Sequence, residues 1–104
     1  MSIKGDRTEG QVLSEQKEKV KEPSQFRVLL HNDNFTTMEF VVYVLMKVFH
    51  KPEEEAFRIM LEVHTTGIGV AGTYSYEIAE MKAHQTIEMA RSNDFPLLCT
   101  IDEI

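Results

Sequence analysis

The sequence lacks a second cysteine: Cys99 is the only one in 104 residues, so the chain cannot form an internal disulfide bond. It contains neither a Cys-x-x-Cys nor a His-x-x-x-His pair, and a structural zinc site is not expected. No stretch approaches the roughly 18 apolar residues of a membrane-spanning helix, and the N-terminus MSIKGDRTEG has no apolar signal region. These absences predict a protein of the reducing cytoplasm that carries no metal or other cofactor.

Positive charge is also scarce. The formal net charge is −6, and residues 25–104 carry six Lys and Arg against twelve Asp and Glu. Nucleic-acid binding requires basic side chains that neutralise phosphates, so this composition argues against that class of function. An acidic domain suits a cationic ligand or a basic partner, although the same charge is ordinary for a soluble protein.

The chain divides at Pro23. Residues 1–24 hold few large apolar side chains, which predicts a flexible N-terminal tail, and residues 25–104 are enough for one domain with a modest core. Within that domain the patterns predict strands at about 25–31, 67–74 and 96–101 and helices at about 37–50, 52–64 and 76–91. We therefore expect an α+β fold in which a small, three-stranded, largely antiparallel sheet is packed against three helices.

Local signals place the ends of the first two helices. Thr36 and Glu39 have the spacing of a capping box, so a helix should begin near Thr37. Pro52 should end it, because the residue before a proline avoids the helical conformation, and should itself occupy the first position of the next helix. Gly67 should close that second helix in a left-handed conformation.

Residues 67–72, Gly-Ile-Gly-Val-Ala-Gly, match the dinucleotide-binding pattern G-x-G-x-x-G. That motif works only between a strand and the helix that follows it, whereas here a helix is predicted to come first. Nucleotide binding is therefore not expected. Gly69 and Gly72 are better explained as strand positions against which something packs closely.

No pattern predicts an enzyme. Cys99 lies in an apolar strand, where a small core residue is expected rather than a nucleophile. Asp33 and His64 could form an acid–base pair, which leaves a small hydrolase as a remote alternative. However, no third catalytic group and no oxyanion motif defines a reaction.

The first helix has more apolar surface than one core-facing stripe requires, since only Glu39 and Lys47 are charged between Met38 and Phe49. One apolar stripe on this helix, and a second stripe on the next helix that ends in a histidine, would enclose an apolar pocket if they faced each other. The stripes are Met38, Val41 and Leu45, and Met60, Val63 and His64.

The mouth of that pocket would be polar, because the segment before the first helix is rich in hydrogen-bonding side chains. The rim would consist of Asn32, Asp33, Asn34, Thr36 and His64. A pocket of this kind suits a ligand with an apolar body and a cationic, hydrogen-bond-donating head. The alternative is a fully packed core with an incidental polar edge.

Four segments of the chain closely resemble the ClpS family of adaptors, over residues 25–103. They are VLLHNDNFTTMEFVVYVL, RIMLEVHTTGIGVAG, EIAEMKA and PLLCT. The resemblance implies an α+β fold related to the C-terminal domain of the ribosomal stalk protein, and no enzymatic activity. It also implies recognition of N-degrons, which are substrates that begin with Leu, Phe, Tyr or Trp, and their delivery to a ClpA-type AAA+ unfoldase.

The resemblance also implies roles for single residues. The α-amino group and the first peptide unit would be held by Asn32, Asn34, Thr36 and His64, with Asp33 in the same turn. The first side chain would enter a pocket formed by Val41, Met60, Val63 and Leu97, and Met38 would act as a gate that excludes branching at Cβ. The unfoldase N-domain would meet Glu77 and Lys82, and the tail would engage the unfoldase at hand-over.

The chain departs from the family in two places. The family usually has Asn-Asp-Asp at positions 32–34, where this chain has Asn-Asp-Asn, and Glu-Thr-Lys at positions 80–82, where it has Glu-Met-Lys. The first change removes a carboxylate near the ligand amine, so we expect it to alter the strength of binding more than its mode. The alternative function is a stalk-like protein–protein interaction domain without a ligand pocket.

Overall fold

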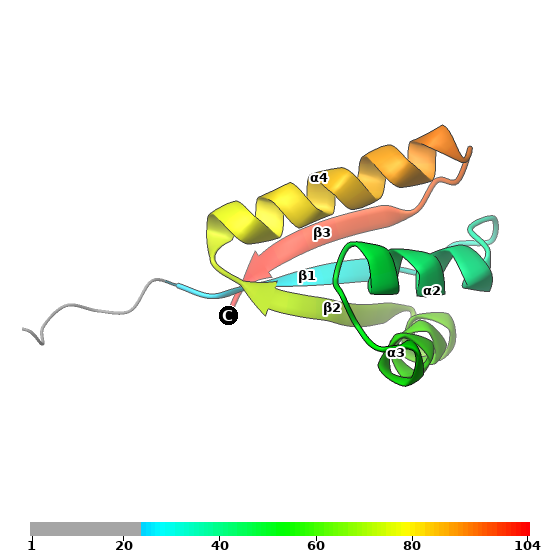
Figure 1. The fold of residues 1–104 in the computed structure, drawn as a ribbon, viewed down its shortest axis with the longest axis horizontal. Coiled ribbons are helices and arrows are strands. Elements are labelled where there is room, and N and C mark those ends of the chain that lie inside the picture. The colour runs from blue at the N-terminus through cyan, green and yellow to red at the C-terminus, as the bar shows by residue number, and fades with distance from the viewer. Residues whose placement is uncertain (1–23) are drawn as a thin grey trace, which may run out of the picture.

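The computed structural model describes residues 24–104, so the predicted tail lies outside the described residues except for Ser24. Its elements are β1 (Phe26–His31), α2 (Met38–Lys47), α3 (Glu53–Thr66), β2 (Ile68–Tyr74), α4 (Tyr76–Ser92) and β3 (Leu98–Glu103) (Figure 1). Strand β1 is central and pairs antiparallel with β2 on one side and β3 on the other. The predicted α+β fold is confirmed.

The helices cover the sheet in two groups. Figure 1 shows α4 running beside β3, while α2 and α3 lie together at the end of the sheet where β1 ends and β2 begins. All of these elements contribute to a single core, in which Leu30 of β1, Leu45 of α2 and Ile59 of α3 are fully buried. The end of β1 and the starts of α2 and β2 therefore come together at one place.

None of the helices in the described part of the chain combines the length and the apolar character that crossing a membrane requires.

The first helix begins where the sequence predicts, but through a different cap. The hydroxyl of Thr37 accepts a hydrogen bond from the backbone N–H of Phe40 at 3.1 Å, so Thr37 is the N-cap. The capping box predicted from Thr36 and Glu39 is wrong, because the Thr36 side chain belongs to the preceding turn. Helix α2 ends at Lys47 rather than near His50.

The other boundaries shift by a few residues. Pro52 is the N-cap of α3 instead of its first residue, and α3 continues past His64 to Thr66. Gly67 ends it as predicted, with φ 96° and its N–H bonded to the Val63 carbonyl at 3.0 Å. Strand β3 begins at Leu98 and runs to Glu103, because its later residues pair with the start of β1.

Gly69 lets helix α3 lie directly on strand β2, as predicted. A Cβ atom at this position would stand 2.6 Å from Cγ2 of Val63 and 3.3 Å from the carbonyl oxygen of Ile59. Any side chain would therefore push the end of α3 away from the sheet. The absence of a side chain at Gly69 therefore sets how closely the end of α3 that carries Val63 packs on β2.

Candidate functional site

A tight turn follows β1 and is held by the side chain of Asp33. Its Oδ1 accepts hydrogen bonds from the backbone N–H groups of Phe35 at 2.8 Å and Thr36 at 2.7 Å. Its Oδ2 accepts a third from the Thr36 hydroxyl at 2.7 Å. The backbone N–H of Asn32 donates to the Gly67 carbonyl at 2.9 Å, which fastens the turn to the end of α3.

The same contacts set the ionisation of Asp33. Partial burial favours the neutral acid, but the hydrogen bonds from Thr36 and Phe35, with the charge of Arg91, outweigh it and lower the Asp33 pKa below its ordinary value of 3.8. Asp33 is therefore a carboxylate at neutral pH. It places a fixed negative charge beside the end of α3.

The turn, the start of α2 and the end of α3 enclose a cavity of about 240 Å³, which we call the rimmed pocket. Its lining residues are Asn32, Asp33, Asn34, Thr36, Met38, Val41, Met60, Val63 and His64. The structure thus brings together the whole predicted polar rim and both predicted apolar stripes, apart from Leu45. Leu45 is buried in the core instead.

The walls of the rimmed pocket differ in depth. Val41, Met60 and Val63 are buried and form an apolar floor, whereas Asn32, Asn34 and His64 are exposed and form the rim. Met38 is 43% exposed and stands at the mouth. Such a cavity offers buried apolar side chains to an apolar group of a ligand. It offers hydrogen-bonding partners at the surface to a polar head.

Leu97 does not line the rimmed pocket. It is only 1% exposed and belongs to the core, so its predicted contact with a ligand side chain stays a prediction. Its depth could not be read from the sequence, because it depends on how the loop before β3 packs. The other four residues expected to surround the first side chain, Met38 included, do line the cavity.

The two residues predicted to meet the unfoldase lie on α4 and do not line the rimmed pocket. Glu77 is exposed in the first turn. The Lys82 Nζ donates to the carbonyl oxygen of Val48 at 2.7 Å, and it lies 5.4 Å from the ring centroid of Tyr74 and 6.0 Å from that of Phe49. Lys82 therefore ties α4 to the C-terminal end of α2, a structural role that sequence reasoning missed.

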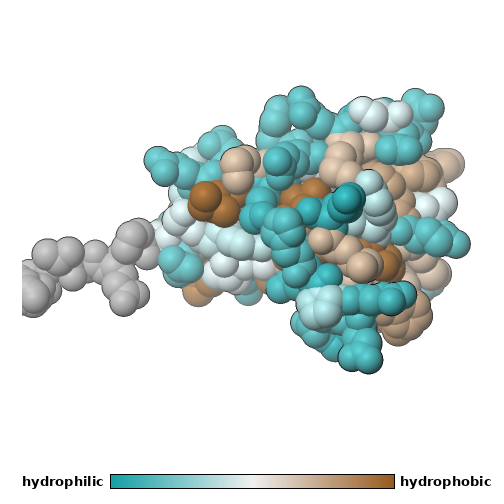
Figure 2. All heavy atoms as spheres, viewed as in Figure 1, coloured by the Kyte–Doolittle hydropathy of each residue, from teal (hydrophilic) through white to brown (hydrophobic). Residues whose placement is uncertain are grey.

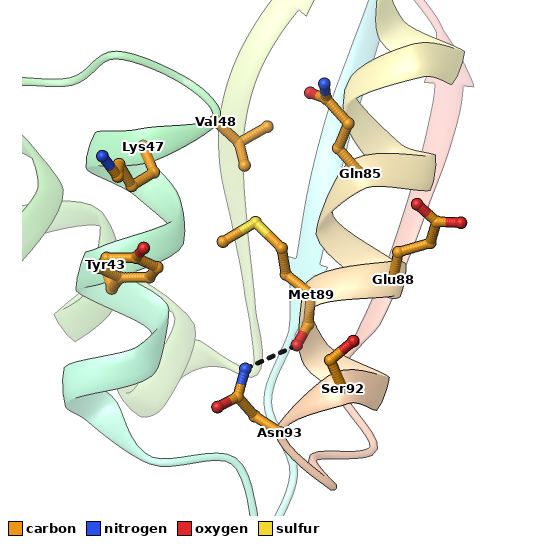
Figure 3. Close-up of a pocket in the computed structure, with 8 residues that line it drawn as sticks. All are labelled: Tyr43, Lys47, Val48, Gln85, Glu88, Met89, Ser92 and Asn93. Atoms are coloured by element: carbon orange, nitrogen blue, oxygen red, sulfur yellow. Dashed lines mark hydrogen bonds between the residues drawn. The ribbon is translucent and has the colours of Figure 1, made fainter.

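A larger hollow of about 590 Å³ lies between α2 and α4, and none of its lining residues is a predicted site residue (Figure 3). It is lined by Tyr43, Lys47, Val48, Gln85, Glu88, Met89, Ser92 and Asn93. Figure 3 shows the Met89 side chain directed from α4 towards α2, and the Asn93 side-chain amide donating to the Met89 carbonyl at 2.9 Å. Its other polar side chains are exposed and of mixed charge, so this cleft has no convergent group that would select a ligand.

Neither of the catalytic candidates forms a reactive arrangement. The carboxylate oxygens of Asp33 accept from Phe35 and Thr36, and in residues 24–104 no hydrogen bond joins them to His64. Burial raises the Cys99 pKa to about 12, against the opposing effect of a hydrogen bond with Thr86, so Cys99 stays a protonated core thiol. Across the same residues, no three His, Cys, Asp or Glu side chains gather in a way that could hold a metal ion.

A small α+β domain whose pocket has a buried apolar floor and a convergent polar rim has the architecture of a ligand-binding domain. The model of the family described as ATP-dependent Clp protease adaptor protein ClpS matches residues 21–100. This chain belongs to the ClpS family of Clp protease adaptors.

Similar proteins match this chain over most of their own length. The ATP-dependent Clp protease adapter protein ClpS of Syntrophus aciditrophicus is 54% identical over 90 residues, which are 86% of this chain and 84% of that protein. The protein of the same name from Caulobacter vibrioides is 52% identical over 92 residues, or 88% of this chain and 84% of its own. The structure of Agrobacterium tumefaciens ClpS2 bound to L-phenylalaninamide matches with a TM-score of 0.77 and 34% identity, covering 80% of this chain and all of that one.

Proposed function

We propose that this protein binds polypeptides through a bulky apolar first residue, Leu, Phe, Tyr or Trp, and delivers them to a ClpA-type AAA+ unfoldase. The observation that carries the proposal is the rimmed pocket, in which buried apolar side chains and hydrogen-bonding side chains line one cavity. The similar ClpS2 protein binds L-phenylalaninamide, which has a free α-amino group and one aromatic side chain. That ligand has the two features that the pocket can satisfy.

The rim would recognise the free amine. An α-amino group has a pKa of about 7.7–8.0, so at neutral pH it is mostly a cation with three N–H donors. Asn32, Asn34 and His64 offer acceptors at the mouth. The Thr36 hydroxyl donates its proton to Asp33, which leaves its lone pairs free to accept, and the ionised Asp33 adds a favourable charge. An internal peptide N–H carries one donor and no charge, so the rim selects a chain terminus.

The floor would recognise the first side chain. Fully burying a Leu or Phe side chain contributes about 1.5–3 kcal/mol, and a small polar side chain gains nothing comparable. Met38 lines the rimmed pocket and is partly exposed, which supports its proposed role as a gate against a second carbon on Cβ. Leu and the aromatic residues are unbranched at Cβ and pass this restriction.

Delivery needs surfaces other than the rimmed pocket. We assign contact with the unfoldase N-domain to the face of α4 that carries Glu77 and Lys82, and hand-over to the tail. In this scheme the protein changes no covalent bond; it only holds the substrate. The setting we propose is the cytoplasm, which the free thiol of Cys99 supports.

A series of peptides that differ only in the first residue tests this function. Peptides beginning with Leu, Phe, Tyr or Trp should bind at least about tenfold more tightly than those beginning with Ser or Gly, measured by fluorescence anisotropy. His64→Ala should weaken binding of the first group, whereas His84→Ala, on the exposed face of α4, should not. Equal binding of all peptides would favour a stalk-like interaction domain, and cleavage of any of them would indicate an enzyme.

A further inference from the structure

A second apolar hollow adjoins the rimmed pocket. Its volume is about 400 Å³, and its lining residues are Met38, Glu39, Val42, Phe57 and Met60. We call it the outer groove. It shares Met38 and Met60 with the rimmed pocket, so the two hollows lie on opposite sides of the same two side chains.

The outer groove opens at the surface and does not deepen the pocket floor. Met38 is 43% exposed and Phe57 52% exposed, while Met60 beneath them is 3% exposed. Along α3, Phe57, Met60 and His64 follow one another at helical spacings of three and four residues, so they form one stripe. This stripe runs from the outer groove at Phe57 to the rimmed pocket at His64.

The exposed side chains of the outer groove make this surface apolar in the free protein. Figure 2 shows hydrophobic atoms reaching the surface over the region where Figure 1 places α2 and α3. Phe57 and Met38 line the same groove, and both side chains are exposed. A ligand that covers them removes this apolar surface from water, which favours binding. The charged residue of the lining is Glu39, which disfavours an acidic occupant and accommodates a basic one at the edge.

We propose that the outer groove binds a large apolar side chain from the second or third residue of the substrate, so that the adaptor reads more than the first residue. The inference rests on the proposed function, because it takes the first side chain to fill the rimmed pocket. Consecutive Cα atoms are about 3.8 Å apart, so the next two residues lie within about 8 Å of the first. Since the two hollows share Met38 as a wall, a chain that leaves the mouth on the Met38 side brings one of these side chains onto Val42 and Phe57.

Peptides with Leu first and either Phe or Ser at the second, third or sixth position test this inference. Phe at the second or third position should tighten binding about threefold to tenfold, and Phe at the sixth should not. The gain should disappear in Phe57→Ser. It should persist in the control Leu61→Ser, because Leu61 is similarly exposed on α3 but lines neither hollow.

The result that would overturn the inference is no gain at the second or third position, or a gain that Phe57→Ser leaves unchanged. A parallel peptide with Ser first separates this failure from that of the proposed function. If Leu-first peptides still bind more tightly than Ser-first peptides in Phe57→Ser, the rimmed pocket works and only the outer groove is in question. If Leu-first and Ser-first peptides bind alike to the unaltered protein, the proposed function itself fails, and this inference with it.

Discussion

Thr36 donates two hydrogen bonds to Asp33: its N–H to Oδ1 and its hydroxyl to Oδ2, each at 2.7 Å. The Asp33 carboxylate also accepts a third hydrogen bond, from the backbone N–H of Phe35, so it links both residues to the start of the turn. The same turn supplies most of the polar rim of the rimmed pocket. The backbone of this turn and the Thr36 side chain are therefore held in place without a ligand, and such preorganisation would reduce the entropy lost on binding.

Asp33→Ala should lower the free energy of unfolding by about 1–2 kcal/mol, because three donors lose their acceptor at a partly exposed site. Binding of a Leu-first peptide should weaken as well, since the rim loses its fixed geometry. Urea denaturation and peptide titration measure the two effects. Thr73→Ala, at an exposed strand position away from the turn, is the control for binding and should leave the peptide affinity unchanged. An Asp33→Ala protein as stable as the unaltered one would show that the turn does not depend on this carboxylate.

The contribution of Asp33 should also depend on pH. Because its pKa is lowered in the folded protein, the unfolded chain binds the proton first, and the stabilisation is complete above the ordinary pKa and lost as pH falls through the folded value. The difference in unfolding free energy between the unaltered protein and Asp33→Asn should therefore shrink from about pH 7 to about pH 2. A difference that stays constant over this range would contradict the assignment.

Met38→Ala should admit peptides that begin with Ile or Val, since a shorter side chain leaves room for a second carbon on Cβ. A competition assay against a Leu-first peptide measures this change in preference. Met46→Ala is the matched control, because Met46 is an exposed methionine on α2 outside the rimmed pocket. If Met38→Ala still rejects Ile and Val as sharply as the unaltered protein, Met38 is not the gate.

Asn34→Asp should tighten binding of a Leu- or Phe-first peptide by about 0.5–1.5 kcal/mol, because a hydrogen bond to an ionised acceptor is stronger than one to an amide. Asn34 is exposed on the rim, so salt should reduce the gain, and so should a pH above the amine pKa. Isothermal titration at low and high salt measures it. Unchanged or weaker binding would mean that Asn34 does not face the amine and that Asp33 supplies the charge.

Substitutions of Lys82 and Glu77 should distinguish an effect on stability from an effect on unfoldase binding. Lys82→Ala removes a charge-assisted hydrogen bond to Val48 and two ring contacts, so we expect it to lower the free energy of unfolding by about 1 kcal/mol. Glu77→Ala removes an exposed side chain and should leave stability unchanged. Both should weaken binding to the unfoldase N-domain. If Glu77→Ala binds it normally, the proposed contact face is wrong.

Much of the rimmed pocket follows from the sequence, because helical spacing decides which side chains share a face. The stripe that holds Met38 and Val41 and the stripe that holds Met60 and Val63 are fixed in this way, and Gly67 fixes where α3 ends. The facing of the two helices depends on tertiary packing, and only the structure shows it.

Features that join distant parts of the chain were not predictable. The bond from Lys82 to the Val48 carbonyl links residues 34 apart, and nothing in either local sequence signals it. The outer groove was not predictable for a related reason: in the sequence Phe57 is one more apolar residue of α3, and only the packing of α2 beside it forms the groove. The three hydrogen bonds of Asp33 also changed its expected role, from a possible acid–base residue to the brace of the turn.

The affinity of one Leu-first peptide, measured with its amine free and with its amine acetylated, tests terminus recognition most directly. Acetylation removes the charge and two donors but keeps the side chain, so it should cost at least about 2 kcal/mol, or roughly thirtyfold in Kd. The polar rim around Asn32 and His64 would then be the part of the site that reads the chain terminus. Equal affinity of the two peptides would show that the rimmed pocket does not recognise a free N-terminus and would contradict the proposed function.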